Sequence, residues 1–258
     1  MKRTLSISVL LLLSIISFAF ASAATTGAKK SFSDESLNYV ITYKWGLIHK
    51  DAGTANLSLK NKGNNYELIL TGRTKPWADK IYQVRDTLYS QVAKDGFRPQ
   101  RYIRIAHEGG KFSKDDIRFS YSGSVVKGTV EKRREKDGKI KTSNASMTAS
   151  NAAYDMLSVF YYLRTIDYSA LDKGKVVKTI LFSGSKRETV KIRSLGIEDA
   201  KMKNGTKRKA YHIRFNFTSD NGKKSSDDID AWLSYDSERI PLVIIGKLPI
   251  GSVRCYLI

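Results

Sequence analysis

The residues best able to act as a nucleophile, acid or base are few in this sequence and far apart. The three histidines, His49, His107 and His212, lie in separate segments, and none belongs to a recognisable metalloprotease, hydrolase or nucleotide-binding motif. Ser183 and Lys186 have the Ser-x-x-Lys spacing of some acyl-transfer enzymes, but the surrounding pattern predicts a hairpin turn and the companion motifs are missing. The sequence therefore favours a protein that is not an enzyme, with no catalytic residue, cofactor or metal ligand assigned.

Two groups of aspartates could in principle bind calcium or form an acid–base pair. Asp115 and Asp116 are adjacent, and Asp227, Asp228 and Asp230 follow a polar turn. Neither group has the glycine and glutamate positions of a calcium-binding loop. We therefore interpret both groups as solvated turn residues.

The chain also carries more large aromatic side chains than one helix packed on a sheet requires. Such residues can line a pocket for an acyl chain or another apolar ligand, with their polar tips turned outward. They can equally be ordinary residues of the core and its rim. The candidate ligand-binding residues are Trp45, Trp77, Phe160, Tyr161, Tyr162 and Trp232.

The formal net charge of +20 is the strongest global property of the sequence. Such an excess favours an anionic partner, either a membrane surface or an acidic polymer, and the export signal described below argues against nucleic acid. The densest runs lie at residues 127–141 and 201–209, each expected at a hairpin tip or loop, where lysines also serve solubility and block edge pairing. The candidate basic docking patch comprises Lys132, Arg133, Arg134, Lys207, Arg208 and Lys209.

The first 23 residues have the pattern of a secretory signal peptide. Lys2 and Arg3 precede an apolar run over residues 5–20, and Ala21-Ser22-Ala23 supplies a cleavage site. An uncleaved membrane anchor is the alternative, although serines dilute the run. No cysteine lies near the cleavage site, so the sequence predicts a soluble periplasmic protein and not a lipoprotein, with no membrane span after cleavage. Removal of this segment leaves a charge of about +18.

The mature chain is predicted to form a flexible segment over residues 24–33 and a single β-rich domain over residues 34–258. Cys255, the only cysteine, cannot form an internal disulfide, so a hydrophobic core must stabilise the fold. We expect Cys255 to be a buried strand residue and the protein to be a monomer.

One helix is expected, over about residues 153–166. Met156, Val159, Phe160 and Leu163 form an apolar stripe, which must be buried because a helix this short is marginal alone. Ser150 or Asn151 is the expected cap. Tyr161 and Tyr162 lie off the stripe, so we expect them at the edge of a pocket.

The rest of the chain alternates with a period of two, as in half-buried β-strands. Residues 37–45 show this alternation most clearly. Residues 132–151 are too polar to show it, and we interpret them as a mobile hairpin end and linker. The predicted fold is mainly β, a strongly curved antiparallel sheet or open barrel of about 11–14 strands with the helix packed on its concave face.

Three segments resemble an exported family called domain of unknown function 3108. They are the opening LNYVITYKWGLIHKDAGTA at 37–55, the helix DMLSVFYYLRTIDY at 155–168 and the ending AWLSYDSERIPLVIIGKLPIGSVR at 231–254. The resemblance implies the cell envelope of a Gram-negative bacterium and a mostly antiparallel fold, with no established activity. More loosely, the expected fold is similar to periplasmic lipoprotein carriers and related lipid-binding half-barrels.

Two functions follow from these patterns. The first is a carrier whose concave face binds a lipid-like envelope component. The second is a scaffold or assembly factor that docks to an anionic polymer or partner protein through its basic surface. The helix decides between them, because a movable lid suits a carrier and a fixed plug suits a scaffold.

Overall fold

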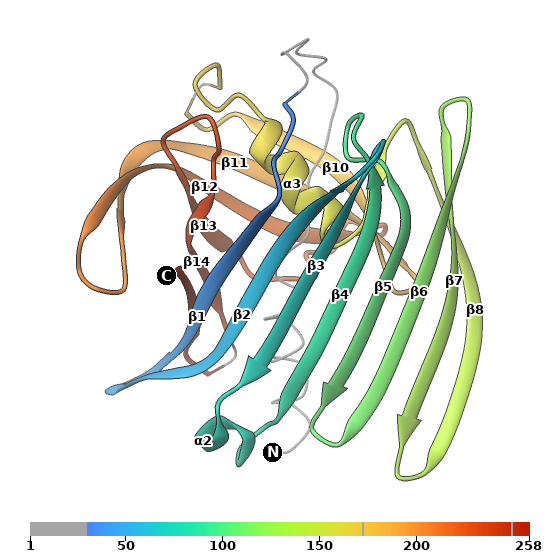
Figure 1. Ribbon diagram of the computed structural model, residues 1–258, viewed down its shortest axis with the longest axis horizontal. Coiled ribbons are helices and arrows are strands. Elements are labelled where there is room, and N and C mark those ends of the chain that lie inside the picture. Colours follow the sequence, from blue (N-terminus) through green and yellow to red (C-terminus); the bar gives the residue numbers. More distant parts are fainter. Residues whose placement is uncertain (1–29, 172, 249) are drawn as a thin grey trace.

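The computed structural model describes residues 30–171, 173–248 and 250–258, and the predicted signal peptide at 1–23 lies outside them. Within these residues fifteen strands form one sheet that curves into a barrel-like shell (Figure 1). Every pair of neighbouring strands is antiparallel except β9 with β10. The predicted fold class is confirmed.

The sheet has two arms that meet at β1 and β15. From the centre outward, the first arm contains β1 (Glu35–Trp45), β2 (Ile48–Lys62), β3 (Asn65–Thr74), β4 (Val84–Ala93), β5 (Pro99–Glu108), β6 (Lys111–Ser122), β7 (Val125–Lys136) and β8 (Lys139–Ser150). The second arm contains β15 (Ser252–Leu257), β14 (Pro241–Lys247), β13 (Ile229–Ser234), β12 (Lys207–Ser219), β11 (Lys186–Lys201), β10 (Val176–Ser183) and β9 (Ala153–Tyr154). The helices are α2 (Pro76–Asp79) and α3 (Ser158–Thr165).

The alternating pattern of the sequence places one face of each strand inside the shell. Leu57, Leu70 and Leu88 lie opposite one another on β2, β3 and β4, and each is at most 2 % exposed. Because successive side chains of a strand point to opposite faces, the residues between them face outward. The resulting core surrounds α3, which crosses the inside of the shell (Figure 1).

The outer parts of the two arms approach each other through side chains. Phe182 of β10 is fully buried and stacks on Phe119 of β6, with ring centroids 5.7 Å apart. Gly128 of β7 provides the room, because a Cβ atom there would lie 2.7 Å from the Phe182 ring. Lys132 of β7 donates to the Ser185 hydroxyl at 2.9 Å. Side-chain packing therefore nearly closes the shell.

The β11–β12 hairpin extends beyond the barrel and folds over its outer face. Met202, near the hairpin tip, is buried with Val40 of β1, Leu242 of β14 and Tyr256 of β15. This second apolar cluster explains why Val40, on the outer face of its strand, is buried. It also fixes the position of the lysines around the tip.

Several sequence-based expectations about segment boundaries were wrong. Residues 132–151 are not a linker but most of the β7–β8 hairpin, which is polar because its outer half is exposed in β8 and exposed or half-buried in β7. Strands β8 and β9 raise the number of strands to fifteen, above the expected range. The helix is shorter than the expected 153–166 because residues 153 and 154 form β9. In the segment expected to be flexible, 24–33, residues 24–29 are not described, but Phe32 is buried in the core.

Candidate functional site

The start of α3 is anchored to β4 by a buried carboxylate. Asp155 Oδ1 accepts hydrogen bonds from the backbone N–H groups of Leu157, at 2.7 Å, and Ser158, at 3.0 Å. The Ser158 hydroxyl accepts from the Asp155 N–H at 2.8 Å, as in a reciprocal helix cap, and Ser90 of β4 donates to Asp155 Oδ2 at 2.6 Å. Asp155, and not Ser150 or Asn151, therefore caps this helix. Burial raises the pKa of the Asp155 carboxyl.

Aromatic side chains from several elements surround the middle of α3 and fill the inside of the shell. Tyr161, Phe97 and Tyr66 stack in a row, with neighbouring centroids 5.9 and 5.3 Å apart. Phe32 packs edge-on against all three rings. Each of these four side chains is at most 4 % exposed, so they form part of the packed core.

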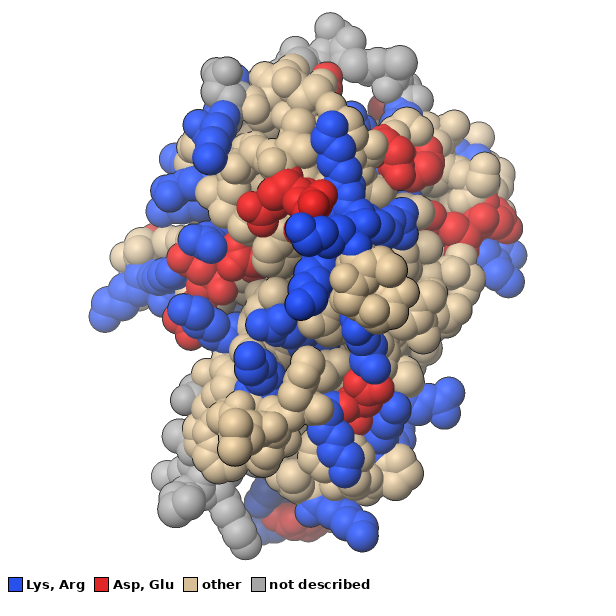
Figure 2. All heavy atoms as spheres, turned by 90° about the vertical axis from the view of Figure 1, so that its left-hand side faces the viewer, with Lys and Arg blue, Asp and Glu red and all other residues tan. Residues whose placement is uncertain are grey.

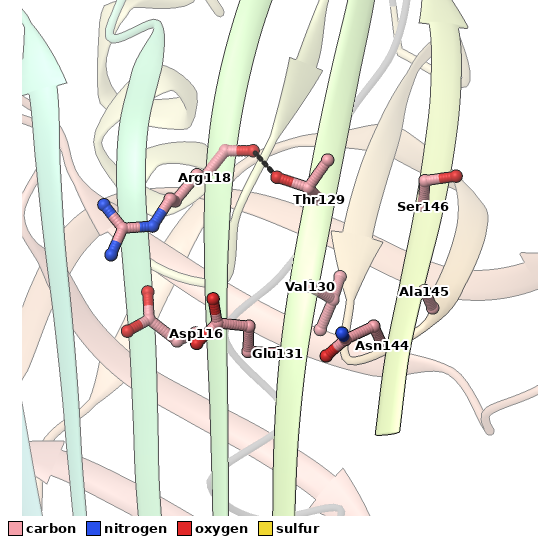
Figure 3. Close-up of a pocket in the computed structure, with 8 residues that line it drawn as sticks. All are labelled: Asp116, Arg118, Thr129, Val130, Glu131, Asn144, Ala145 and Ser146. Carbon is pink, nitrogen blue, oxygen red and sulfur yellow. Dashed lines mark hydrogen bonds between the residues drawn. The ribbon is translucent and has the colours of Figure 1, made fainter. Parts of the chain in front are cut away.

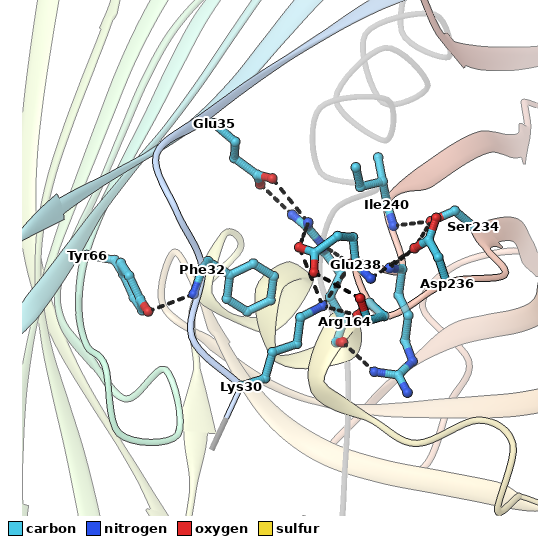
Figure 4. A network of polar contacts seen from close by, with 11 residues as sticks. Lys30, Phe32, Glu35, Tyr66, Arg164, Ser234, Asp236, Glu238 and Ile240 are labelled. Carbon is cyan, nitrogen blue, oxygen red and sulfur yellow. Dashed lines mark hydrogen bonds and ion pairs between the residues drawn. The ribbon is translucent and has the colours of Figure 1, made fainter. Parts of the chain in front are cut away.

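The end of α3 is held by the guanidinium of Arg164, whose side chain has no exposed surface (Figure 4). Both terminal nitrogens bind the Glu35 carboxylate of β1, one of them at 3.1 Å. Arg164 Nε donates to the Glu238 carbonyl, in the β13–β14 turn, at 3.0 Å. The same guanidinium lies over the rings of Phe32, at 4.6 Å, and Tyr161, at 5.1 Å. One side chain thus joins the helix to both arms of the sheet.

Lys30 closes this network from the segment that precedes β1. Its ammonium group donates to the carbonyl oxygens of Ser237 and Glu238, the latter at 3.0 Å. Burial lowers the pKa of Lys30 to about 8, against the opposing effect of the Glu238 charge. The contacts tie residues 30–35 across the same end of the shell as the β13–β14 turn (Figure 4).

A second ionic cluster lies on the concave face of β4 and β5. Arg104 Nη2 donates to Asp86 at 2.9 Å and to Glu108 at 2.7 Å, and these three side chains are at most 12 % exposed. Burial, together with the nearby Glu108 charge, raises the pKa of Asp86 to about 8 despite the Arg104 charge. One guanidinium therefore serves two buried carboxyl groups.

Replacing Asp86 with asparagine should reveal this raised pKa as a pH dependence of stability. A carboxyl whose pKa is higher in the folded than in the unfolded state binds protons more strongly when folded, so its contribution to stability falls as the pH rises from the ordinary pKa of 3.8 to about 8. The asparagine side chain cannot ionise, so the melting temperature of Asp86→Asn relative to wild type should be higher at pH 9 than at pH 5. Thermal unfolding at both values measures this difference, and a difference independent of pH would contradict the assignment.

The aspartates of β6 are not the solvated turn residues that the sequence suggested. Asp115 and Asp116 are 6 % and 5 % exposed and lie on opposite faces of the strand. Arg134 Nη2 binds Asp115 at 2.5 Å, and Arg101 binds Asp116 through two nitrogens, at 3.0 and 2.7 Å. Both aspartates therefore stabilise strand pairing.

A hollow of about 410 Å³ lies on the outer face of β6, β7 and β8 (Figure 3). Its polar lining forms two rows across the three strands, which are Asp116, Glu131 and Asn144, then Arg118, Thr129 and Ser146. No aromatic side chain lines it, whereas ligand pockets are usually apolar and aromatic. We interpret the hollow as a dip between outward-facing side chains of a twisted sheet.

The candidate aromatic residues do not converge on one pocket. Phe160 and Tyr161 are buried in the core, and Tyr162 stacks on Tyr154 at 4.7 Å. The expectation that Tyr161 lies at a pocket edge was wrong, because its side chain is completely buried.

The three tryptophans lie elsewhere. Trp45 is 54 % exposed at the end of β1. Trp77, in α2, donates to the Asp51 carbonyl at 2.8 Å and lies under Lys50. Trp232 is on the outer face of β13, stacked on His212. The aromatic candidates are therefore divided between the core and separate positions around the shell.

The first half of the candidate basic patch is largely engaged in internal contacts. Strand alternation turns Lys132 and Arg134 to the concave face, where they bind Ser185 and Asp115. Arg133 points outward and pairs with Glu135 at 2.9 Å. These three residues do not form one surface.

The second half is exposed on the β11–β12 hairpin, where strand alternation puts Lys207 and Lys209 on one face and Arg208 on the other. Lys201 and Lys207 are directly opposite each other, and Arg208 is opposite Ala200. Lys207 contacts Asp199 at 3.5 Å, and Lys209 lies over the Tyr235 ring. Figure 2 views the molecule from this side and shows that Lys and Arg side chains outnumber Asp and Glu on the face.

His212, in β12, is held between two carboxylates. Its ring nitrogens are 3.0 Å from Glu198 and 2.7 Å from Asp230. Among the described residues, no group of three or more His, Cys, Asp or Glu side chains has an arrangement that could hold a metal ion. Burial raises the pKa of Cys255, in β15, to about 12.

A family model described as "Protein of unknown function (DUF3108)" matches residues 38–258. The chain belongs to the DUF3108 family. A search of curated proteins finds no match. No helix in the described part of this DUF3108 protein is long and apolar enough to cross a membrane.

Two solved structures are similar to this DUF3108 protein. A β-barrel-like protein of domain of unknown function DUF1849 from Brucella abortus has 12 % identity and a TM-score of 0.59, covering 88 % of this chain and 96 % of that one. A putative exported protein with a YmcC-like fold from Bacteroides fragilis has 8 % identity and a TM-score of 0.31, covering 93 % and 97 %. The first likeness supports the barrel-like fold.

Proposed function

We propose that this DUF3108 protein is an exported, non-catalytic component of the cell envelope that docks to an anionic partner through the β11–β12 hairpin. The observation that carries the proposal is the placement of Lys201 and Lys207 directly opposite each other at an exposed hairpin. Like charges in this position repel, so the arrangement costs stability unless an anion lies between them.

The surroundings of this pair support the proposal. Five basic residues, Lys201, Lys203, Lys207, Arg208 and Lys209, are exposed on the hairpin. Asp199 is the only acidic residue between positions 199 and 209. Among the described residues, no carboxylate forms an ion pair with Lys201, so its ammonium group remains available to a partner.

The carrier function receives less support from the geometry. A carrier needs room for an apolar ligand next to the helix, and here α3 is buried and attached at both ends by Asp155 and Arg164. A fixed plug leaves the outer surface as the place where a partner binds.

Replacing Lys201 and Lys207 with glutamine should weaken binding to an anionic polymer more than the same change in charge elsewhere. Elution from immobilised polyglutamate by rising NaCl measures this, since salt screens contacts between exposed charges. The double variant Lys127→Gln/Lys178→Gln, at exposed positions of β7 and β10, is the matched control. Elution of both double variants at the same salt concentration would show that only net charge matters and would contradict the proposed surface.

A further inference from the structure

At the end of the barrel that carries α2, two neighbouring hairpins expose large apolar side chains. Trp45, Leu47 and Ile48 at the β1–β2 turn are 54 %, 104 % and 45 % exposed, and Ile250 at the β14–β15 turn is 48 % exposed. Turn tips usually carry glycine, asparagine or other polar residues, so an apolar tip requires an explanation. We refer to these four residues as the apolar tips.

The two turns are held side by side. Lys44 of β1 pairs with Ser252 of β15, and the Tyr43 hydroxyl donates to the Ile250 carbonyl at 3.0 Å. Gly251 has a positive φ of 84°, and a Cβ atom there would lie 2.3 Å from the Lys44 carbonyl oxygen. Only glycine permits this approach, which makes the apolar tips one surface.

A row that contains two lysines lies directly behind the apolar tips. His49, Lys44, Ser252 and Lys247 face one another in that order across four neighbouring strands. Lys44 and Lys247 are exposed. Residues 43–50 and 246–252 contain no acidic residue.

This arrangement matches an anionic lipid surface. Apolar side chains with a tryptophan enter the boundary between headgroups and acyl chains, while lysines about 3.3 Å further back along each strand reach the phosphates. The apolar tips protrude, and a protruding surface suits a deformable bilayer better than it suits a rigid partner.

We infer that the apolar tips and the lysines behind them dock the protein to a membrane containing anionic phospholipid. The inference rests on the proposed function, because it names the anionic partner. The β11–β12 hairpin is continuous with the surface formed by the apolar tips and these lysines, because Lys203 binds Asp51 of β2 at 3.0 Å, next to Lys50. The hairpin would add electrostatic attraction to the membrane without inserting into it.

Sedimentation of the purified protein with vesicles tests the inference. Wild type should bind vesicles of phosphatidylcholine with phosphatidylglycerol and not vesicles of phosphatidylcholine alone. Leu47→Asp should weaken binding about tenfold or more, and Lys44→Gln and Lys247→Gln about fivefold each. An aspartate is favoured in turns, so Leu47→Asp should retain the melting temperature of wild type. Val125→Asp, at a position that is 46 % exposed at the opposite end of the sheet, is the control and should bind normally.

The outcomes separate this inference from the proposed function. Equal binding by Leu47→Asp and wild type would overturn insertion of the apolar tips while leaving electrostatic docking intact. Absence of vesicle binding together with salt-sensitive binding to polyglutamate would overturn the membrane as partner only. Absence of both would overturn the proposed function as well. Quenching of tryptophan fluorescence by brominated acyl chains that is lost in Trp45→Phe would confirm insertion.

Discussion

Replacing Arg164 with methionine should lower the free energy of unfolding by about 3 kcal/mol, because breaking a buried ion pair leaves its partner uncompensated. The Glu35 carboxylate, whose side chain is only 17 % exposed, would lose both of its contacts to the guanidinium. The carbonyl of Glu238 and the rings of Phe32 and Tyr161 would lose a cation as well. For a domain of this size, the loss corresponds to a fall in melting temperature of about 6–12 °C.

Two further variants serve as controls for the Arg164→Met measurement. Arg193→Met, at an exposed position of β11, should change the stability by no more than about 0.5 kcal/mol. Arg164→Lys keeps the charge but not the planar donors, so it should fall between wild type and Arg164→Met. If α3 were a movable lid, Arg164→Met would leave the melting temperature unchanged and increase the binding of an apolar fluorescent dye to the folded protein.

The second large effect is expected at the other end of α3. Asp155→Ala removes the acceptor of the Leu157 and Ser158 N–H groups and the partner of the Ser90 hydroxyl, all within the core. Loss of a cap combined with buried polar groups left unpaired should cost about 2–3 kcal/mol. Chemical unfolding measures this as a lower midpoint with an unchanged slope.

Asparagine provides the matched variant at this position. Asp155→Asn keeps an oxygen that accepts from the two N–H groups, and its amide can donate to the Ser90 hydroxyl. It should therefore retain most of the stability that Asp155→Ala loses. Equal losses in both variants would mean that the carboxylate acts by its charge and not as a hydrogen-bond acceptor.

Strands could be predicted from the sequence where one face is exposed to solvent and the other is buried. Residues 37–45 are the clearest example, and they form most of β1. The prediction failed for residues 139–150, where six consecutive residues from Lys139 to Asn144 are exposed and no alternation can appear. Pairing with β7, and not burial, makes this segment a strand.

The helix shows a different limit. The predicted stripe of Met156, Val159, Phe160 and Leu163 is buried as expected. Tyr161 was misplaced because analysis of an apolar stripe assumes that the opposite face of a helix meets water. A helix enclosed by a barrel has almost no such face, and Tyr161 and Arg164 are buried with it.

Arg164 itself carried no signal in the sequence. Its partners Glu35 and Glu238 are 129 and 74 residues away, and an arginine at the end of a helix is ordinarily solvated. The apolar tips could have been noticed, because Leu47 follows Gly46 at a turn between two predicted strands. The contribution of Ile250, in the β14–β15 turn, could not have been predicted from the sequence, because only the pairing of β1 with β15 brings this turn next to the β1–β2 turn.

The position of β1 and β15 has a consequence for how the molecule acquires its structure. Almost every strand pairs with its neighbour in sequence. Each arm can therefore form by successive pairing of short hairpins, whose closure costs little chain entropy. Among the strands that the structure describes, only the β1–β15 ladder joins residues about two hundred positions apart, such as Tyr39 and Leu257. The seam between the arms is therefore expected to form last, and a chain lacking β15 would present two half-sheets with open edges to proteases.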